Sequence, residues 1–171
     1  MWSSAAKTMK IAIIADTHDN LANLDRFFEA IAKREIEGLL HCGDVANIET
    51  LTYLTEHFSG EIKLACGNAE INREEFFDLA KQVKNLTVFD ELGEWEIDGH
   101  RLAFIHKPDQ TGELAETGRY DFIFHGHTHQ PWIKQIGSVL IANPGALTGG
   151  TVAPTYTLFD SVTGRLELVR L

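Results

Sequence analysis

Residues 10–20, KIAIIADTHDN, contain the two features that decide the fold: an apolar run and, directly after it, a polar loop. The run over residues 10–15 is nearly continuous in apolar side chains, which is typical of a strand buried on both faces of a sheet. Functional side chains gather at the carboxyl ends of strands in open α/β sheets. The polar loop at residues 16–20 is therefore a candidate site.

The first half of the chain alternates strands and helices. Leu21, Leu24, Phe27, Phe28 and Ile31 recur at helical spacing and predict an amphipathic helix over 21–34. The remaining elements of this half are a strand at 38–42, a helix at 48–58 and a strand at 62–66. This β-α-β-α-β order predicts a parallel sheet with right-handed crossovers.

The second half is rich in short strands. One helix is expected near 73–83 and another near 110–117. Asp98-Gly99 is a two-residue hairpin signal, and residues 161–164 are expected to form another turn. The expected strands are 94–98, 101–105, 121–125, 132–136, 139–142, 155–160 and 165–169. We expect them to form a mixed sheet that packs on the first, within a single domain spanning residues 9–171.

Polar donors follow five of the expected strands. Glycine allows the backbone to turn sharply beside such a donor. The donors occur in the segments Asp16-Thr17-His18, Gly43-Asp44, Gly67-Asn68, His106 and Gly126-His127-Thr128-His129.

Carboxylates and imidazoles without thiolates suit Mn, Fe, Ni, Co or Zn. The seven donors are too many for one tetrahedral ion, but they are enough for two ions about 3.5–4 Å apart that share one carboxylate. We therefore expect a cofactor of two divalent transition-metal ions, with manganese favoured. Such a pair of ions is suited to phosphoryl transfer.

The motifs D-x-H, G-D, G-N, H and G-H-T-H, in this order, resemble those of the calcineurin-like metallophosphoesterase superfamily. The short chain, with Asn143-Pro144-Gly145 near its end, is similar to the small bacterial and archaeal phosphodiesterase branch. This resemblance covers residues 9–171. It implies a two-sheet β-sandwich flanked by helices, in four α/β/β/α layers.

The resemblance also implies a role for each donor. Asp16, His18 and His129 would bind one ion, and Asn68, His106 and His127 the other, with Asp44 bridging the two. Asp44, Asn68 and His106 would also take part in catalysis, because a hydroxide bridging the ions would attack phosphorus in line with the leaving group. The expected substrate is a small phosphate ester, and a phosphodiester is favoured.

The sequence departs from the family pattern at two places. Ala69 stands where the family often carries His or Cys, and His there is the usual candidate for the acid that protonates the leaving group. Lys107-Pro108 follows His106 in place of the usual Gly-His. Departure of the leaving group and the contacts to substrate are therefore less predictable than the metal ligands.

Other polar residues carry alternative readings. His41 and His125 are either ordinary surface or core residues or supports for the ligands. His57 is expected at an exposed helix end and His100 in the hairpin turn. Asp19 and Asn20 are expected to cap a helix rather than bind metal. Glu70, Asn143 and Lys107 are secondary candidates near the site. A different class of function, a protein-interaction scaffold of the same fold, is the alternative to an enzyme.

Composition sets the remaining expectations. The net charge of −10 disfavours non-specific nucleic-acid binding, and no apolar run is long enough to cross a membrane. Cys42 and Cys66 are too few for a disulfide scaffold, so we expect a cytoplasmic protein with reduced thiols. Residues 1–8 are read either as a disordered arm or as an artificial remnant. Homo-oligomer formation is left open.

Overall fold

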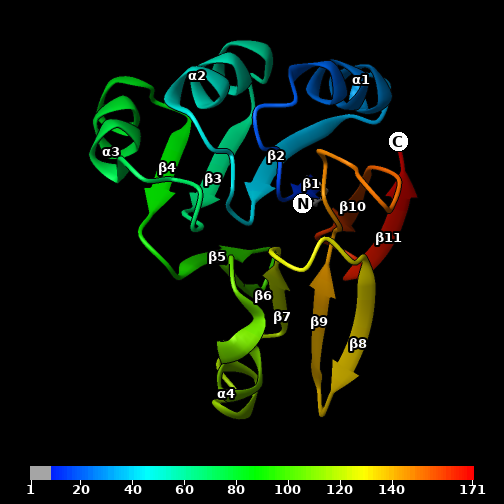
Figure 1. Ribbon diagram of the computed structural model, residues 1–171. Helices are drawn as coiled ribbons and strands as arrows, with labels where there is room; N and C mark the ends of the chain where they lie inside the picture. The colour runs from blue at the N-terminus through cyan, green and yellow to red at the C-terminus, as the bar shows by residue number, and fades with distance from the viewer. Residues whose placement is uncertain (1–8) are drawn as a thin grey trace, which may run out of the picture.

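The computed structural model describes residues 9–171, and the expectation for residues 1–8 lies outside these described residues. Two sheets face each other (Figure 1). The larger, sheet A, has the strand order β11-β10-β1-β2-β3-β4. Its strands are β1 (Lys10–Ile14), β2 (Ile36–His41), β3 (Glu61–Ala65), β4 (Leu86–Phe89), β10 (Thr155–Asp160) and β11 (Arg165–Arg170).

The smaller sheet, sheet B, has the order β5-β6-β7-β9-β8. Its strands are β5 (Gly93–Ile97), β6 (His100–Ile105), β7 (Phe122–His125), β8 (Trp132–Ile136) and β9 (Val139–Asn143). Strands β6, β7 and β9 run parallel, and the two outer strands pair antiparallel. The carboxyl ends of β6 and β7 therefore deliver their loops to the same edge of sheet B.

Helices cover the outer faces of both sheets (Figure 1). Sheet A is covered by α1 (Leu21–Ile31), α2 (Ile48–His57) and α3 (Arg73–Gln82), and sheet B by α4 (Thr111–Glu116), which follows the short 3₁₀ helix η1 (Pro108–Gln110). The result is the four-layer α/β/β/α sandwich that the resemblance implied.

Strand β1 shows why the central strand is apolar throughout. Ile11 and Ile13 pack between the two sheets, whereas Ala12 and Ile14 pack under the helices. Successive side chains of a strand point to opposite faces, so a strand covered on both faces needs apolar residues at every position. Packing on both faces holds β1 at the middle of sheet A. It therefore also sets the position of the loop that begins at Asp16, directly after the strand.

Most of the predicted elements are confirmed, including the parallel β1-β2-β3 unit. The hairpin at Asp98-Gly99 is also confirmed. Both residues have positive φ, 48° and 82°, as a type I′ turn requires. The turn at residues 161–164 is closed by the Gly164 N–H, which donates to the Asp160 carbonyl at 2.9 Å.

Two expectations about the fold were wrong, and one strand was not predicted. Strands β10 and β11 do not join the second sheet. Instead, β10 pairs antiparallel with β1. This pairing places Phe159 opposite Ile11, and both side chains are buried between the two sheets. The short edge strand β4 was missed. Helix α1 ends at Ile31 rather than 34, where a turn leads to Glu35 with a positive φ of 53°. Among the described residues, no helix is long and apolar enough to cross a membrane.

Candidate metal centre

The seven predicted donors all lie on loops that follow the carboxyl ends of strands. They come from both sheets: Asp16 and His18 follow β1, Asp44 follows β2, Asn68 follows β3, His106 follows β6, and His127 and His129 follow β7. The two sheets therefore bring together donors that lie far apart in the sequence.

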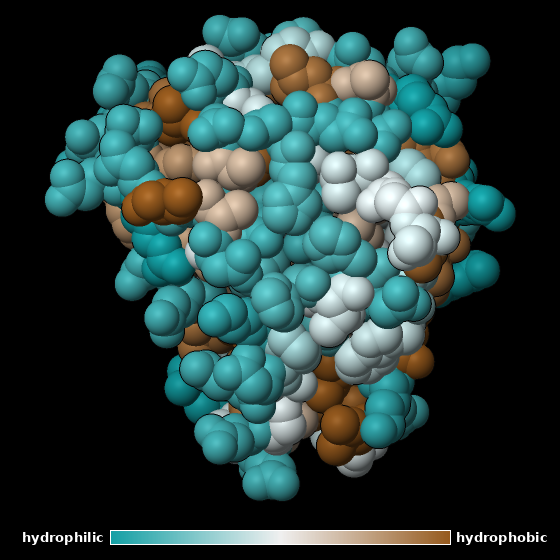
Figure 2. All heavy atoms as spheres, viewed as in Figure 1, coloured by the Kyte–Doolittle hydropathy of each residue, from teal (hydrophilic) through white to brown (hydrophobic). Residues whose placement is uncertain are grey.

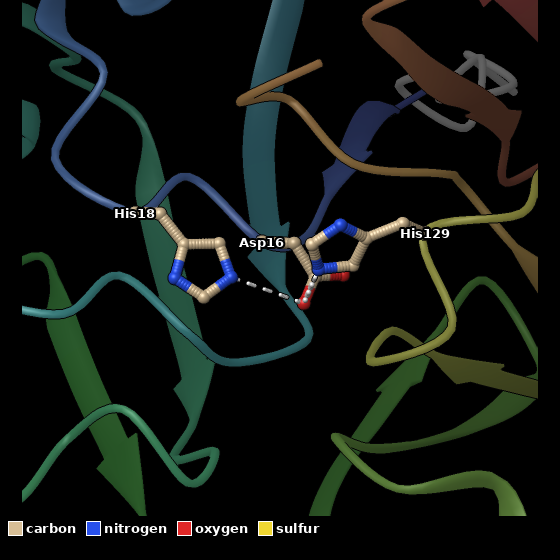
Figure 3. Close-up of side chains that lie close together, drawn as sticks. All are labelled: Asp16, His18 and His129. Carbon is tan, nitrogen blue, oxygen red and sulfur yellow. Dashed lines mark ion pairs between the residues drawn. The ribbon is translucent and has the colours of Figure 1, made fainter. Parts of the chain in front are cut away.

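One group of donors contains Asp16, His18 and His129, whose candidate ligand atoms all lie within 4.8 Å of one another. The Oδ1 atom of Asp16 is 3.3 Å from Nε2 of His129 and 3.8 Å from Nε2 of His18. Figure 3 shows the carboxylate between the two imidazoles. This arrangement of one carboxylate and two imidazoles can hold a divalent transition metal.

Asp16 is fully buried, and its carboxylate accepts a hydrogen bond of 3.0 Å from the His127 N–H. Burial raises the pKa of Asp16 from 3.8 to about 7, with a further rise from the nearby charge of Asp44. The protein by itself therefore provides too little positive charge near Asp16 to stabilise the ionised form of this carboxylate. A bound cation would supply that charge.

The second group contains Asp44, His106 and His127, and the side chain of Asn68 lies beside it. The Nε2 atom of His106 is 3.0 Å from Oδ1 of Asn68, 3.1 Å from Nδ1 of His127 and 3.3 Å from Oδ2 of Asp44. The Nδ1 of His106 lies 2.9 Å from the Cys42 carbonyl, which can only accept, so Nδ1 carries a proton.

In neutral His106 the Nε2 atom therefore presents a lone pair to these other acceptors. Burial lowers the pKa of His106, but hydrogen bonds to Asp44 and Cys42 outweigh it and raise the pKa overall. Either a proton or a cation must lie among these atoms. A metal-binding imidazole usually donates its other N–H to a carbonyl or carboxylate, as His106 does here. The residues present thus fit a metal ion.

Asp44 lies between the two groups. Its Oδ2 atom is 3.5 Å from Nε2 of His18 in the first group and 3.3 Å from Nε2 of His106 in the second. Its Oδ1 accepts a hydrogen bond of 2.8 Å from the Ala69 N–H. Burial alone would raise the pKa of Asp44, but hydrogen bonds from His106 and Ala69 lower it to about 2. Asp44 is thus an ionised carboxylate that faces both groups.

The ligand loops adopt a backbone conformation that most residues avoid. Positive φ angles occur at Asp16 (52°), His18 (43°), Asp44 (60°), His127 (69°) and His129 (56°). Such non-glycine residues cost on the order of 1–3 kcal/mol each and persist at sites where the surroundings hold them. The strain is therefore concentrated at the candidate ligands.

Several supporting residues were only secondary candidates in the sequence. Asn143 donates to the Gly126 carbonyl at 3.1 Å and to the Thr128 hydroxyl at 2.9 Å, so it orders the loop of His127 and His129. The buried His41 contacts Thr17 and the Gly43 N–H. His41 therefore links two ligand loops. Its position at the end of β2, next to a ligand loop, was the only feature of the sequence that indicated this supporting role.

The helix-capping expectation is confirmed for Asn20, whose side chain accepts from the Asn23 N–H at 3.1 Å. Asp19 instead accepts from the Asn47 N–H and the Thr50 hydroxyl at the start of α2. His57 lies at an exposed helix end, whereas His100 packs on Phe122 in sheet B.

Comparison with known proteins agrees with this geometry. Residues 9–164 match the model of the calcineurin-like phosphoesterase superfamily domain. A protein named phosphodiesterase from Methanocaldococcus jannaschii is 30% identical over 156 residues, which cover 90% of this chain and 93% of the relative. A probable metallophosphoesterase from Methanothermobacter thermautotrophicus is 28% identical over 82% of this chain and 78% of its own length.

Two solved structures show the same fold. An archaeal protein described as a novel phosphodiesterase superposes with a TM-score of 0.87 at 28% identity, over 95% of this chain and all of its own. Vacuolar protein sorting 29 from Cryptosporidium parvum superposes with a TM-score of 0.63 at 16% identity, over 96% of this chain and 97% of its own, and shows the fold alone. The chain belongs to the calcineurin-like phosphoesterase superfamily and is a metal-dependent phosphoesterase.

Proposed function

We propose that the protein is a binuclear phosphodiesterase in which Asp44 bridges two divalent ions. The observation that carries this proposal is the position of the Asp44 carboxylate, which lies within 3.5 Å of an imidazole nitrogen from each ligand group. Asp16, His18 and His129 would hold the first ion, and Asn68, His106 and His127 the second. Manganese is our favoured metal, although carboxylate, imidazole and amide donors without thiolates equally suit Fe, Ni, Co or Zn.

Two bound ions would draw negative charge from the phosphoryl oxygens and lower the pKa of a water molecule, which favours in-line hydrolysis. The chain's own residues prepare the centre for this chemistry. The Cys42 carbonyl fixes the proton of His106 on Nδ1 and leaves Nε2 as a ligand atom. The Asn68 side chain is exposed beside His106, and its amide donates to Oδ2 of Asp44 at 3.4 Å, so its second N–H could donate to a phosphoryl oxygen. Ala69 has no proton to give to the leaving group.

A pocket beside the second ligand group is suited to one substituent of the ester. It has a volume of about 220 Å³ and lies between the β3–α3 loop and the segment after β6. Its walls include buried apolar side chains, Cys66 and Ile105, and more polar ones at Arg73, Lys107 and Gln110. A phosphodiester, which carries a second substituent, makes fuller use of this pocket than a monoester does.

The remaining expectations belong to the same proposal. The substrate is a small phosphate ester rather than a nucleic acid, since the net charge of −10 opposes non-specific binding to a polyanion. A reduced cytoplasmic setting suits Cys42 and Cys66, which are free and buried.

The alternative function, a protein-interaction scaffold, has no need of donors at all seven ligand positions. On the face seen in Figure 2, hydrophobic residues lie in separate small groups rather than in one large docking patch.

The test combines metal content with hydrolysis. Protein reconstituted with Mn²⁺ should contain two ions per chain by elemental analysis and should hydrolyse bis(4-nitrophenyl) phosphate. Asp44→Asn should lower the occupancy of both sites and abolish most of the activity. Glu74→Gln, a matched change at an exposed acid of α3, should alter neither. A metal content that never exceeds one ion per chain would contradict the binuclear proposal.

A further inference from the structure

The carboxylate of Glu70 connects two ligand loops through backbone hydrogen bonds. Only 2% of this residue is exposed. Its Oε2 accepts from the Asp44 N–H at 3.1 Å and from the Gly67 N–H, and its Oε1 accepts from the Ala46 N–H at 3.1 Å. Asp44 and Ala46 belong to the β2–α2 loop, whereas Gly67 belongs to the β3–α3 loop. One buried carboxyl group therefore ties the β2–α2 loop to the β3–α3 loop, to which Glu70 itself belongs.

Two of these three donors belong to residues with an unfavourable backbone. The φ angles are 60° at Asp44 and 86° at Ala46, and neither residue is a glycine. Such a conformation persists only when surrounding contacts determine it. The hydrogen bonds of Glu70 reach the amides of both residues, so they act at the place where the loop requires support.

The two loops also touch directly. A Cβ atom at Gly67 would lie 2.3 Å from Oδ1 of Asp44, and one at Gly43 would lie 2.8 Å from the Gly67 nitrogen. The carbonyl of Gly67 accepts from the Arg73 guanidinium at 2.8 Å, so both polar backbone groups of this residue are held. The approach of the loops leaves little room for a shift of Asp44 relative to Asn68.

The contacts of Glu70 and Ala69 orient the Asp44 carboxylate. Glu70 fixes the Asp44 amide, and the next residue back, Ala69, donates its N–H to Oδ1 of Asp44. The other oxygen, Oδ2, faces His18 and His106 and accepts a long hydrogen bond of 3.4 Å from Nδ2 of Asn68. Both oxygens of Glu70 accept from loop backbone N–H groups, so they are engaged away from the ligand imidazoles.

We propose that Glu70 is a positioning residue that sets the loops of Asp44 and Asn68 against each other before any metal binds. This inference rests on the proposed two-ion centre. Asn68 belongs to the second ligand group, whereas Asp16, His18 and His129 lie on other loops than the two that the hydrogen bonds of Glu70 join. Asp44 would serve both sites and Asn68 only the second, so loss of Glu70 weakens both metal sites and the second more than the first.

The experiment compares Glu70→Gln with the control Glu74→Gln, an exposed acid four residues along the same segment. Glutamine keeps the size of the side chain but replaces one acceptor by an NH₂ donor, which would face a backbone N–H. Calorimetric titration of Mn²⁺ into metal-free protein should show the second site weakened about tenfold to a hundredfold, the range for loss of a group that supports a ligand. The first site, which keeps its own donors Asp16, His18 and His129, should be weakened less than the second. Equal weakening of both sites, or of neither, would overturn the proposal.

A second readout needs neither metal nor activity. In the metal-free wild type, the amide protons of Asp44, Ala46 and Gly67 should exchange slowly with solvent, and Glu70→Gln should speed all three while Glu74→Gln leaves them unchanged. Rapid exchange of these amides in the wild type would overturn the proposal even if Glu70→Gln does not fold. If the wild type bound one ion only, the binuclear function would fail, and the exchange data would still decide the role of Glu70.

Discussion

The Nε2 atom of His41 lies 2.7 Å from the hydroxyl of Thr17, and both side chains are fully buried. The Gly43 N–H donates to Nδ1 of His41 at 3.1 Å. The proton of the neutral ring therefore resides on Nε2, which donates to Thr17. This ring joins the β1–α1 loop of Asp16 and His18 to the β2–α2 loop of Asp44.

The pairing predicts how acid affects folding. Burial lowers the pKa of His41 from 6.5 to about 3. Between these values the unfolded chain binds a proton that the folded chain excludes, so the contribution of His41 to stability is full above pH 6.5 and is lost as pH falls toward 3. The free energy of unfolding of the metal-free wild type should fall more steeply over this window than that of His41→Asn. Urea unfolding at several pH values measures this, and parallel curves would contradict it.

The same pair predicts that either of two substitutions at position 41 leaves one hydrogen-bonding partner unpaired. Asn at position 41 can replace Nδ1 as the acceptor for Gly43, whereas Gln can reach toward Thr17 and leave the Gly43 N–H without its partner. A buried donor left unpaired costs about 1–3 kcal/mol. Thermal and urea unfolding at neutral pH should show both variants destabilised by an amount of this order. Wild-type stability in either variant would mean that the His41 hydrogen bonds add nothing.

Metal binding at the first site should depend on pH through Asp16. Its pKa of about 7 in the metal-free protein, caused mainly by burial, means that the ion must displace a proton in acid solution. The affinity for Mn²⁺ should rise by up to about tenfold per pH unit below pH 7 and flatten above it. Carbon-13 NMR of the metal-free protein should show an aspartate carboxyl that titrates near pH 7 and is missing from Asp16→Asn. Affinity that is constant below pH 7 would contradict this prediction.

Ala69 predicts a steep dependence of rate on the leaving group. The side chain cannot donate a proton, so the leaving oxygen must depart with little assistance. Esters of acidic phenols should react readily, and alkyl esters slowly, in a series of matched phosphodiesters. The measurement is kcat/KM against leaving-group pKa. A flat line, with the chemical step shown to limit the rate, would require another proton donor near the site.

Ala69→His should then favour poor leaving groups selectively. An imidazole titrates near neutral pH and can donate where a methyl group cannot, and such assistance is worth up to about 10²–10⁴-fold. The kcat/KM for an alkyl phosphodiester should rise while that for the matched aryl ester changes little. Ala69→Phe, which adds a ring without an acidic proton, is the control. Equal effects of histidine on both esters would point to altered binding instead.

Lys107 should contribute to substrate binding. It is exposed and lines the pocket beside His106. Its ammonium can attract the phosphate group of a bound ester, so Lys107→Met should raise KM for a phosphodiester and leave kcat nearly unchanged. Lys84→Met, far from the pocket in sequence and absent from its walls, is the control. A fall in kcat at constant KM would assign Lys107 to the chemical step.

The contrast between what the sequence predicted and what it missed has a physical basis. Local periodicity predicted β1 through β3 and the helices between them, because each element has its own apolar pattern. The pairing of β10 with β1 depends on residues far apart in the chain, where no local pattern identifies the partner. Strand β4 is a four-residue edge, too short for a clear alternation.

The metal centre likewise has features that the sequence predicted and features that it did not. The ligands carry side chains of a recognisable type and spacing, so their approximate grouping could be proposed from motifs. Their supports act through the backbone: the Cys42 carbonyl orients His106, and the amides of Asp44, Ala46 and Gly67 hold Glu70. A peptide group is the same in every residue, so these contacts leave no trace in the sequence.

The antiparallel pairing of β1 with β10 has a consequence for synthesis of the chain. Met9 donates its N–H to the hydroxyl of Ser161, 152 residues later, at the edge of this pairing. Until residues 155–160 have left the ribosome, β1 lacks one neighbour and presents an open apolar edge, which is a template for aggregation. Chains that lack residues 155–171 should therefore precipitate or be degraded, and the metal centre should assemble only after β10 has been synthesised.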